Sequence, residues 1–153
     1  MTLNVSAPYG YTIFSDDVRQ EVGGKISYIG TYNTELILSN PPPIQLAKLV
    51  LSINYFDDPK YANKELRLTV HFPGDAEDKP QVDIKIQAEA PGISLQKISD
   101  NEQMLHFVGQ LVLAPAKFER LGSFRVKMRR GDVVTRLGNL KVSAQEPPPA
   151  PRS

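Results

Sequence analysis

The sequence predicts an all-β fold: a single antiparallel β-sandwich of immunoglobulin-like or C2-like type, with about nine strands and at most short helical turns. Two observations predict this fold. Apolar and polar residues alternate along most of the chain, which is the period of a strand with one buried and one solvated face. Turn sequences rich in Gly, Pro, Asn and Asp separate the alternating segments, as is typical of two packed sheets.

The alternation is clearest at residues 65–72 and 82–90, where every second residue is apolar. Seven more segments have a similar pattern: residues 9–14, 25–32, 35–38, 49–55, 104–113, 123–130 and 133–142. The alternation lapses at residues 44–48 and 116–120, and we expect a short helical turn at each of these places.

The chain has 153 residues, the usual length of one domain, and it shows neither an internal repeat nor a second hydrophobic core. We expect an N-terminal arm at residues 1–8, the sandwich at residues 9–144 and an extended tail at residues 145–153. Four prolines in the tail favour a polyproline-like conformation. The chain contains no cysteine, which excludes disulfides, zinc–thiolate sites and thiol nucleophiles.

The first residues lack a basic start followed by an apolar run, and no stretch approaches the roughly 18 apolar residues of a membrane span. We therefore expect a protein of the bacterial cytoplasm, or a virion component assembled there, without a membrane partner.

Charge is unevenly distributed along the chain. Residues 1–115 carry nine Lys and Arg against fourteen Asp and Glu, a net charge of −5, whereas residues 116–153 carry nine against three, a net charge of +6. Such asymmetry fits an anionic partner, subunits that meet acidic face to basic face, or one solvated basic hairpin.

Basic residues occupy every second position of the expected strand at residues 123–130. Arg125, Lys127 and Arg129 therefore share one face of that strand. Three more bases follow: Arg130, Arg136 and Lys141. This stripe fits a solvated face, a surface for an acidic protein, or a phosphate-binding surface. Nucleic acid is the least favoured partner, because the stripe lacks interleaved aromatic residues and the net charge is +1.

The usual catalytic motifs are missing from the sequence. His71 and His106 stand at outward positions of expected strands, without a serine, carboxylate or second histidine at triad or metal-pair spacing. Nucleophile-elbow, Walker-type and dinucleotide-binding glycine patterns are also missing. We therefore expect neither an enzyme nor a cofactor or metal site. Paired carboxylates such as Asp57 with Asp75 are the one hydrolase arrangement left open.

Acidic residues gather in three groups: Asp16 and Asp17 with Glu21; Asp57 with Asp58; and Asp75, Glu77 and Asp78. Loops at one end of a sandwich can collect such oxygen ligands around calcium. Acidic residues beside Pro and Gly are also ordinary turn residues, so calcium binding is a minor alternative.

Residues 14–32, FSDDVRQEVGGKISYIGTY, resemble the opening signature of a family of small bacterial and phage proteins of unknown function. The likeness extends loosely to the hairpin that ends at residues 140–142. The resemblance implies no activity, cofactor or catalytic residue.

Within this signature, we expect three acidic residues and two bases to form ion pairs across a short loop closed by Gly23 and Gly24. These residues are Asp16, Asp17, Glu21, Arg19 and Lys25. Alternatively, the charged loop belongs to a contact surface, since loops carried on rigid sheets commonly do.

These observations favour a non-catalytic structural or interaction module, with a phage virion as one setting, that docks through charged faces, sheet edges and termini. We expect a protein partner or self-association. The alternative is a domain that binds a carbohydrate or other ligand on an exposed aromatic platform. Its candidate residues are Tyr9, Tyr11, Tyr28, Tyr32, Tyr55 and Tyr61.

Overall fold

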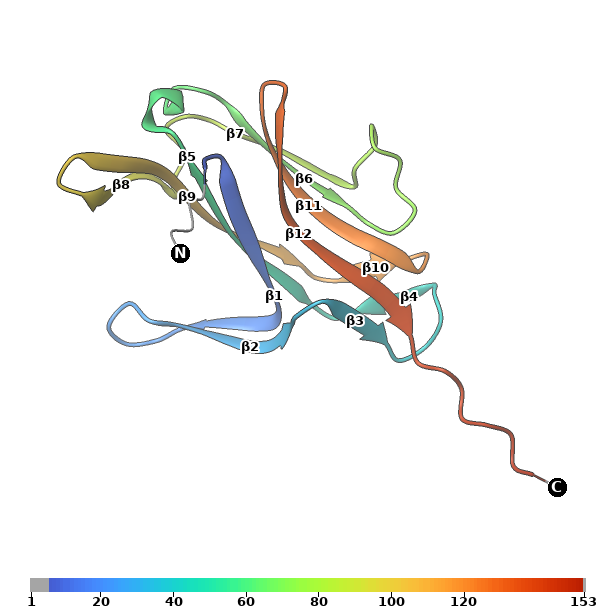
Figure 1. The fold of residues 1–153 in the computed structure, drawn as a ribbon. Coiled ribbons are helices and arrows are strands. Elements are labelled where there is room, and N and C mark those ends of the chain that lie inside the picture. Colours follow the sequence, from blue (N-terminus) through green and yellow to red (C-terminus); the bar gives the residue numbers. More distant parts are fainter. Residues whose placement is uncertain (1–5, 153) are drawn as a thin grey trace, which may run out of the picture.

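The computed structural model describes residues 6–152, and this part of the chain is all-β, as the sequence predicts. It contains twelve strands and one short 3-10 turn (Figure 1). The strands are β1 (Tyr9–Gln20), β2 (Ile26–Tyr32), β3 (Glu35–Leu38), β4 (Ile44–Leu46), β5 (Leu49–Asp57), β6 (Leu66–His71), β7 (Val82–Ile86), β8 (Ile93–Ser99), β9 (Glu102–Leu113), β10 (Ala116–Phe118), β11 (Gly122–Arg130) and β12 (Val133–Ala144). The turn, η1, is Pro59–Tyr61.

The expected helical turns are wrong. Residues 44–46 and 116–118 instead form β4 and β10, which pair with each other as a small antiparallel sheet. Both segments are too short for alternation to be recognised. The third strand that the sequence did not predict is β8, an edge strand whose side chains are mostly exposed on both faces. Its alternation of apolar and polar residues breaks after four residues, at Lys97.

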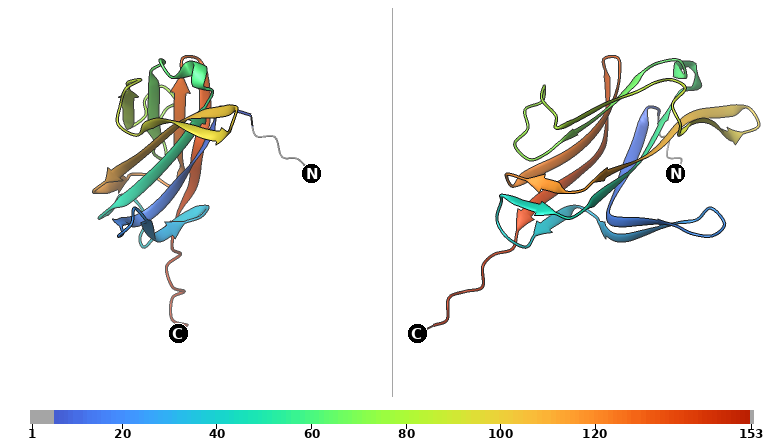
Figure 2. Two further views of the ribbon diagram at one scale, coloured as in Figure 1. Left: turned by 90° about the vertical axis from the view of Figure 1, so that its left-hand side faces the viewer. Right: turned by 180° about the vertical axis from the view of Figure 1, so that it is seen from behind.

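Ten strands form two packed sheets, a sandwich-like arrangement that Figure 2 shows from the side and from behind. The first sheet has the order β2-β1-β5-β9-β8 and the second has the order β3-β12-β11-β6-β7. Neighbouring strands are antiparallel except β12 and β3, which are parallel. The prediction of a purely antiparallel fold is therefore wrong for this pair.

One hydrophobic core fills the space between the two sheets. Four phenylalanines cluster in it, and the rings of Phe72 and Phe124 meet edge to face with centroids 4.8 Å apart. On β11, Phe124, Val126 and Met128 all point into this core, each at most 1% exposed. The residues between them must therefore face outward, as the sequence predicts.

A β-bulge on β12 determines which of its residues face outward. Val126 lies opposite Gly138, but Lys127 lies opposite Arg136, so Leu137 is the extra residue. Without the bulge, Leu137 would oppose Lys127 on the outer face and Arg136 would point toward the core. With it, Leu137 stays buried at 3% exposure and Arg136 lies beside Lys127.

After β12 the tail leaves the body of the molecule, and residues 145–152 are exposed and form neither helix nor strand (Figure 1). Residues 1–5 of the expected N-terminal arm, and residue 153 of the tail, lie outside the described residues. Within residues 6–152, no helix has the length and apolar character needed to cross a membrane.

Candidate functional site

The outer face of the second sheet brings basic side chains from three neighbouring strands together. Arg125, Lys127 and Arg129 of β11 point outward as predicted, with Arg136 of β12 opposite Lys127 and Arg67 of β6 opposite Arg129. We call these five residues the basic face. The sequence identified four of them; Arg67 was missed because its place beside Arg129 depends on the pairing of β6 with β11.

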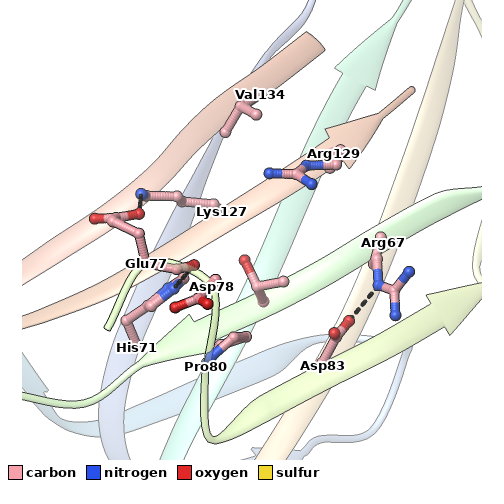
Figure 3. Close-up of a pocket in the computed structure, with 10 residues that line it drawn as sticks. Arg67, His71, Glu77, Asp78, Pro80, Asp83, Lys127, Arg129 and Val134 are labelled. Carbon is pink, nitrogen blue, oxygen red and sulfur yellow. Dashed lines mark hydrogen bonds and ion pairs between the residues drawn. The ribbon is translucent and has the colours of Figure 1, made fainter. Parts of the chain in front are cut away.

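Two adjoining grooves lie over the basic face. The larger, about 480 Å³, runs over Arg67 and Arg129, and the smaller, about 380 Å³, runs over Arg125 and Arg136. Both are lined by Lys127 and by an acidic residue from the β6–β7 loop. Figure 3 shows the larger groove.

That acidic residue is Glu77, which lies across two of the five bases. One of its carboxylate oxygens accepts a hydrogen bond from Arg125, and the other accepts one from Lys127 Nζ at 2.9 Å. The hydrogen bonds from Lys127 and Arg125 lower the pKa of Glu77 to about 2. The sequence marked Glu77 only as part of an acidic turn, since its partners are 48 and 50 residues away.

The loop that carries Glu77 has internal hydrogen bonds. Asp75 accepts hydrogen bonds from the backbone N–H of Phe72 at 2.9 Å and of Gln81 at 3.1 Å. The Gln81 side chain donates a third at 3.1 Å. These bonds tie the two ends of the loop together.

His71 lies beneath this loop. Its register opposite Arg125 confirms the outward side, but the side chain is only 3% exposed, because the loop covers it. His71 Nε2 is 3.0 Å from the Glu77 carbonyl oxygen, which can only accept, so Nε2 carries the proton. Nδ1 is buried and has no hydrogen-bond partner among residues 6–152.

The remaining bases differ in their pairing. Arg67 Nε donates to Asp83 at 2.5 Å, and this hydrogen bond raises the pKa of Arg67. For Arg129 and Arg136 the structure gives no ion pair with any residue between 6 and 152, and both side chains are exposed. They are therefore the cations of the basic face that remain available.

The structure places two of the predicted bases elsewhere. Arg130, at the end of β11, turns toward Asp57 at the end of β5 and is not part of the basic face. Lys141 lies on β12 near Glu35, at 3.9 Å.

The charged residues of the first hairpin do not form the expected loop. Since β1 continues to Gln20, Asp16, Asp17 and Arg19 are strand residues, and only Glu21 and Lys25 of the expected set lie in the loop between β1 and β2. Tyr32 donates to Asp16, and Lys48 pairs with Asp17 and lowers its pKa. The expected ion pairs with Arg19 and Lys25 do not occur among the described residues, because the hairpin partners of β1 are residues of β2 without charge.

The uneven charge of the sequence is partly compensated within the fold. Of the seven ion pairs among residues 6–152, four join an acid from the first 115 residues to a base beyond them. These are the pairs of Glu77 with Arg125 and Lys127, of Asp57 with Arg130, and of Glu35 with Lys141. The asymmetry therefore does not separate into one acidic and one basic half.

The tyrosines considered for ligand binding are scattered. Tyr9 stacks on Phe56 with centroids 5.0 Å apart, and Phe56 stacks on His106 at 4.3 Å, so these rings cover one another's faces. Burial lowers the pKa of His106, whose Nε2 lies 3.0 Å from Asn54. Tyr11 is 49% exposed on the outer face of the first sheet.

The carboxylates considered for catalysis are also apart. Asp57 lies at the end of the sheets where β6 begins, and Asp75 lies beyond the end of β6, so the two are separated by the length of that strand. Between residues 6 and 152, no three His, Asp or Glu side chains form a group that could hold a metal ion.

The chain matches no protein-family model and no curated protein. The resemblance of residues 14–32 to small bacterial and phage proteins therefore stays a prediction.

Proposed function

We propose that this protein is a non-catalytic binding module whose basic face docks on an acidic segment of a protein partner. One observation carries the proposal. Glu77, a carboxylate of the chain itself, is bound by two bases of the face. Arg129, two residues along β11 from Lys127, and Arg136, opposite Lys127 on β12, are paired with no acid between residues 6 and 152. The face thus binds a carboxylate already and has cations left for others.

The lining of the grooves favours a protein over a nucleic acid. Three acidic residues, Glu77, Asp78 and Asp83, line the larger groove together with three bases. The aromatic ring among the residues that line the two grooves is the imidazole of His71, and at 3% exposure it offers no face on which a base could stack. A phosphate backbone would be repelled by these carboxylates along its length. Separate acidic side chains can instead reach the cations one at a time.

The biological setting is part of the same proposal. A structural component, with a phage virion as one setting, fits the sequence resemblance, the two-sheet fold and the exposed proline-rich tail. An immunoglobulin-like or C2-like type for the fold is likewise proposed, on the basis of two packed five-stranded sheets.

The second candidate function is carbohydrate binding, and Tyr11 favours it. Its half-exposed ring lies on the outer face of the first sheet, near the 44% exposed side chain of Val108, which is two strands away in the same row. Binding to a glycan array that is lost in Tyr11→Ala would support this candidate function. If the protein binds no glycan on the array, carbohydrate binding is excluded.

The test of the main proposal is fluorescence anisotropy with a labelled synthetic peptide in which glutamate alternates with serine. We compare the natural protein with Arg129→Gln/Arg136→Gln and with a control of equal charge, Lys64→Gln/Lys117→Gln, which changes two exposed lysines outside the basic face. We expect the first variant to bind about tenfold more weakly, since two partly exposed charge contacts contribute roughly 0.7 kcal/mol each.

The control variant should bind nearly as well as the natural protein. An equal loss of peptide affinity in both variants would contradict the proposal, because it would mean that binding depends only on the net charge of the protein. If an oligonucleotide of equal charge binds more tightly than the peptide, the partner of the basic face is a nucleic acid and not a protein.

A further inference from the structure

The carboxylate of Glu77 occupies a position on the basic face that a partner could use. We propose that Glu77 is a built-in competitor for the site: an acidic side chain of the partner displaces it from Arg125 and Lys127, and the site takes an extended segment in which alternate residues are acidic. This inference rests on the proposed function and adds both the spacing of the ligand and its regulation.

The exposure of the three side chains supports displacement. Glu77 is 66% exposed, whereas Arg125 and Lys127 are 29% and 18% exposed. The two bases are therefore held by the sheet, and the carboxylate lies on its solvent side. An incoming carboxylate can approach the same two donors as Glu77 swings away.

The loop itself need not move for this exchange. The backbone carbonyl of Glu77 is held by His71 at 3.0 Å, and Asp75 closes the loop through Phe72 and Gln81. Only the side-chain torsions of Glu77 have to change, and its carboxylate is already 66% exposed to solvent. Competition is therefore a local exchange of one carboxylate for another.

The spacing of the bases defines the ligand. Arg125, Lys127 and Arg129 repeat at every second residue of β11, which is about 6.8 Å along an antiparallel strand. An extended segment lying along this strand presents alternate side chains at the same interval. Its first carboxylate takes the position of Glu77, and its second reaches Arg129.

Glu77 competes at neutral pH because its ionised carboxylate accepts hydrogen bonds from both Arg125 and Lys127. Its pKa of about 2 means that it stays ionised under all ordinary conditions. Removing its charge should therefore free two cations at once and leave the sheet that holds them unchanged.

The experiment uses the same labelled peptide with Glu77→Gln and with a matched control, Asp78→Asn. Asp78 is the next residue of the loop, is exposed, lines the larger groove and has no ion pair with the rest of residues 6–152. Both variants remove one negative charge at the same place. We expect Glu77→Gln to bind the peptide about tenfold more tightly and Asp78→Asn to change the affinity by less than about threefold.

Two further comparisons make the result specific. The gain in peptide affinity from Glu77→Gln should disappear when Arg125→Gln and Lys127→Gln are added. Melting temperatures confirm that every variant is folded. A peptide of equal composition with its glutamates contiguous should bind more weakly than the alternating peptide.

The outcomes separate this inference from the proposed function. If the natural protein binds the peptide through Arg129 and Arg136 but Glu77→Gln binds no better than Asp78→Asn, the competitor role is overturned and the proposed function stands. If neither the natural protein nor Glu77→Gln binds the peptide, the proposed function fails as well. Equal affinity for the two peptides would contradict the claim that the site takes an extended segment with acidic residues at alternate positions.

Discussion

Arg130 donates a hydrogen bond from Nε to Asp57 Oδ2 at 2.6 Å, which joins the end of β11 in one sheet to the end of β5 in the other. Tyr55 donates to the same oxygen at 2.7 Å, and the Arg130 guanidinium lies 3.4 Å from the centre of the Tyr61 ring. Asp57 is 1% exposed. Although burial alone would lower the pKa of Arg130, its hydrogen bond to the Asp57 carboxylate raises it.

Replacing Asp57 with alanine should therefore destabilise the fold by about 3–5 kcal/mol, because it leaves the Arg130 charge mostly buried without a partner. Urea unfolding measures this change. Asp132→Ala, in the exposed turn between β11 and β12, is the control and should cost less than about 0.5 kcal/mol.

A double-mutant cycle tests whether the pair itself is responsible. Asp57→Asn combined with Arg130→Met should lose less stability than the sum of the two single changes, since neither charge is then left alone. Simple additivity would contradict a direct interaction between the two side chains.

The contact of Glu77 predicts a pH dependence of stability. Because folding lowers the pKa of Glu77 from 4.5 to about 2, its ion pairs stabilise the folded state fully above about pH 5 and are lost as the pH falls toward 2. The melting temperature of Glu77→Gln should therefore be lower than that of the natural protein at pH 7, and the difference should shrink between pH 5 and pH 2. A difference that does not change with pH would mean that the carboxylate makes no such contact.

Close packing of β1 predicts the effect of a single methyl group. A Cβ on Gly10 would lie 2.6 Å from Leu137 Cδ2 and would also meet the Asn54 carbonyl oxygen. We expect Gly10→Ala to destabilise the protein by about 1–3 kcal/mol in urea unfolding, because the backbone cannot yield easily. Gly109→Ala, whose Cβ would meet only the tip of the Phe107 ring, should cost less.

Internal pairing of charge predicts how the protein behaves alone in solution. Since four ion pairs already join the acidic and basic parts of the chain, we expect a mass that changes neither with salt nor on truncation after Ala144. Sedimentation over a range of concentrations measures this. Oligomers that dissociate in salt and weaken without the tail would instead identify the acidic partner as a second copy of the chain.

The sequence predicts side-chain orientation best where one face of a strand is buried. On β11 the alternation of Phe124, Val126 and Met128 with three bases places both the core and the basic stripe correctly. On β8, an edge strand exposed on both faces, the alternation of Ile93 and Leu95 with polar residues breaks at Lys97 and is too short to identify a strand.

The rest of the site depends on relations that span the chain. Glu77 reaches its two bases because the β6–β7 loop folds over a strand about 50 residues away. Arg136 joins the face only because Leu137 bulges, and no local pattern marks a one-residue shift of register. The burial of His71 follows from the same loop and not from its strand position.

The most direct test of the central claim is a titration of the labelled protein with the alternating glutamate peptide, followed by two-dimensional NMR. Docking on the basic face predicts that the largest shift changes occur at Arg125, Lys127, Arg129 and Arg136, with the outer face of the first sheet, marked by Tyr11, unchanged. Changes centred on Tyr11, or spread evenly over exposed lysines, would contradict it.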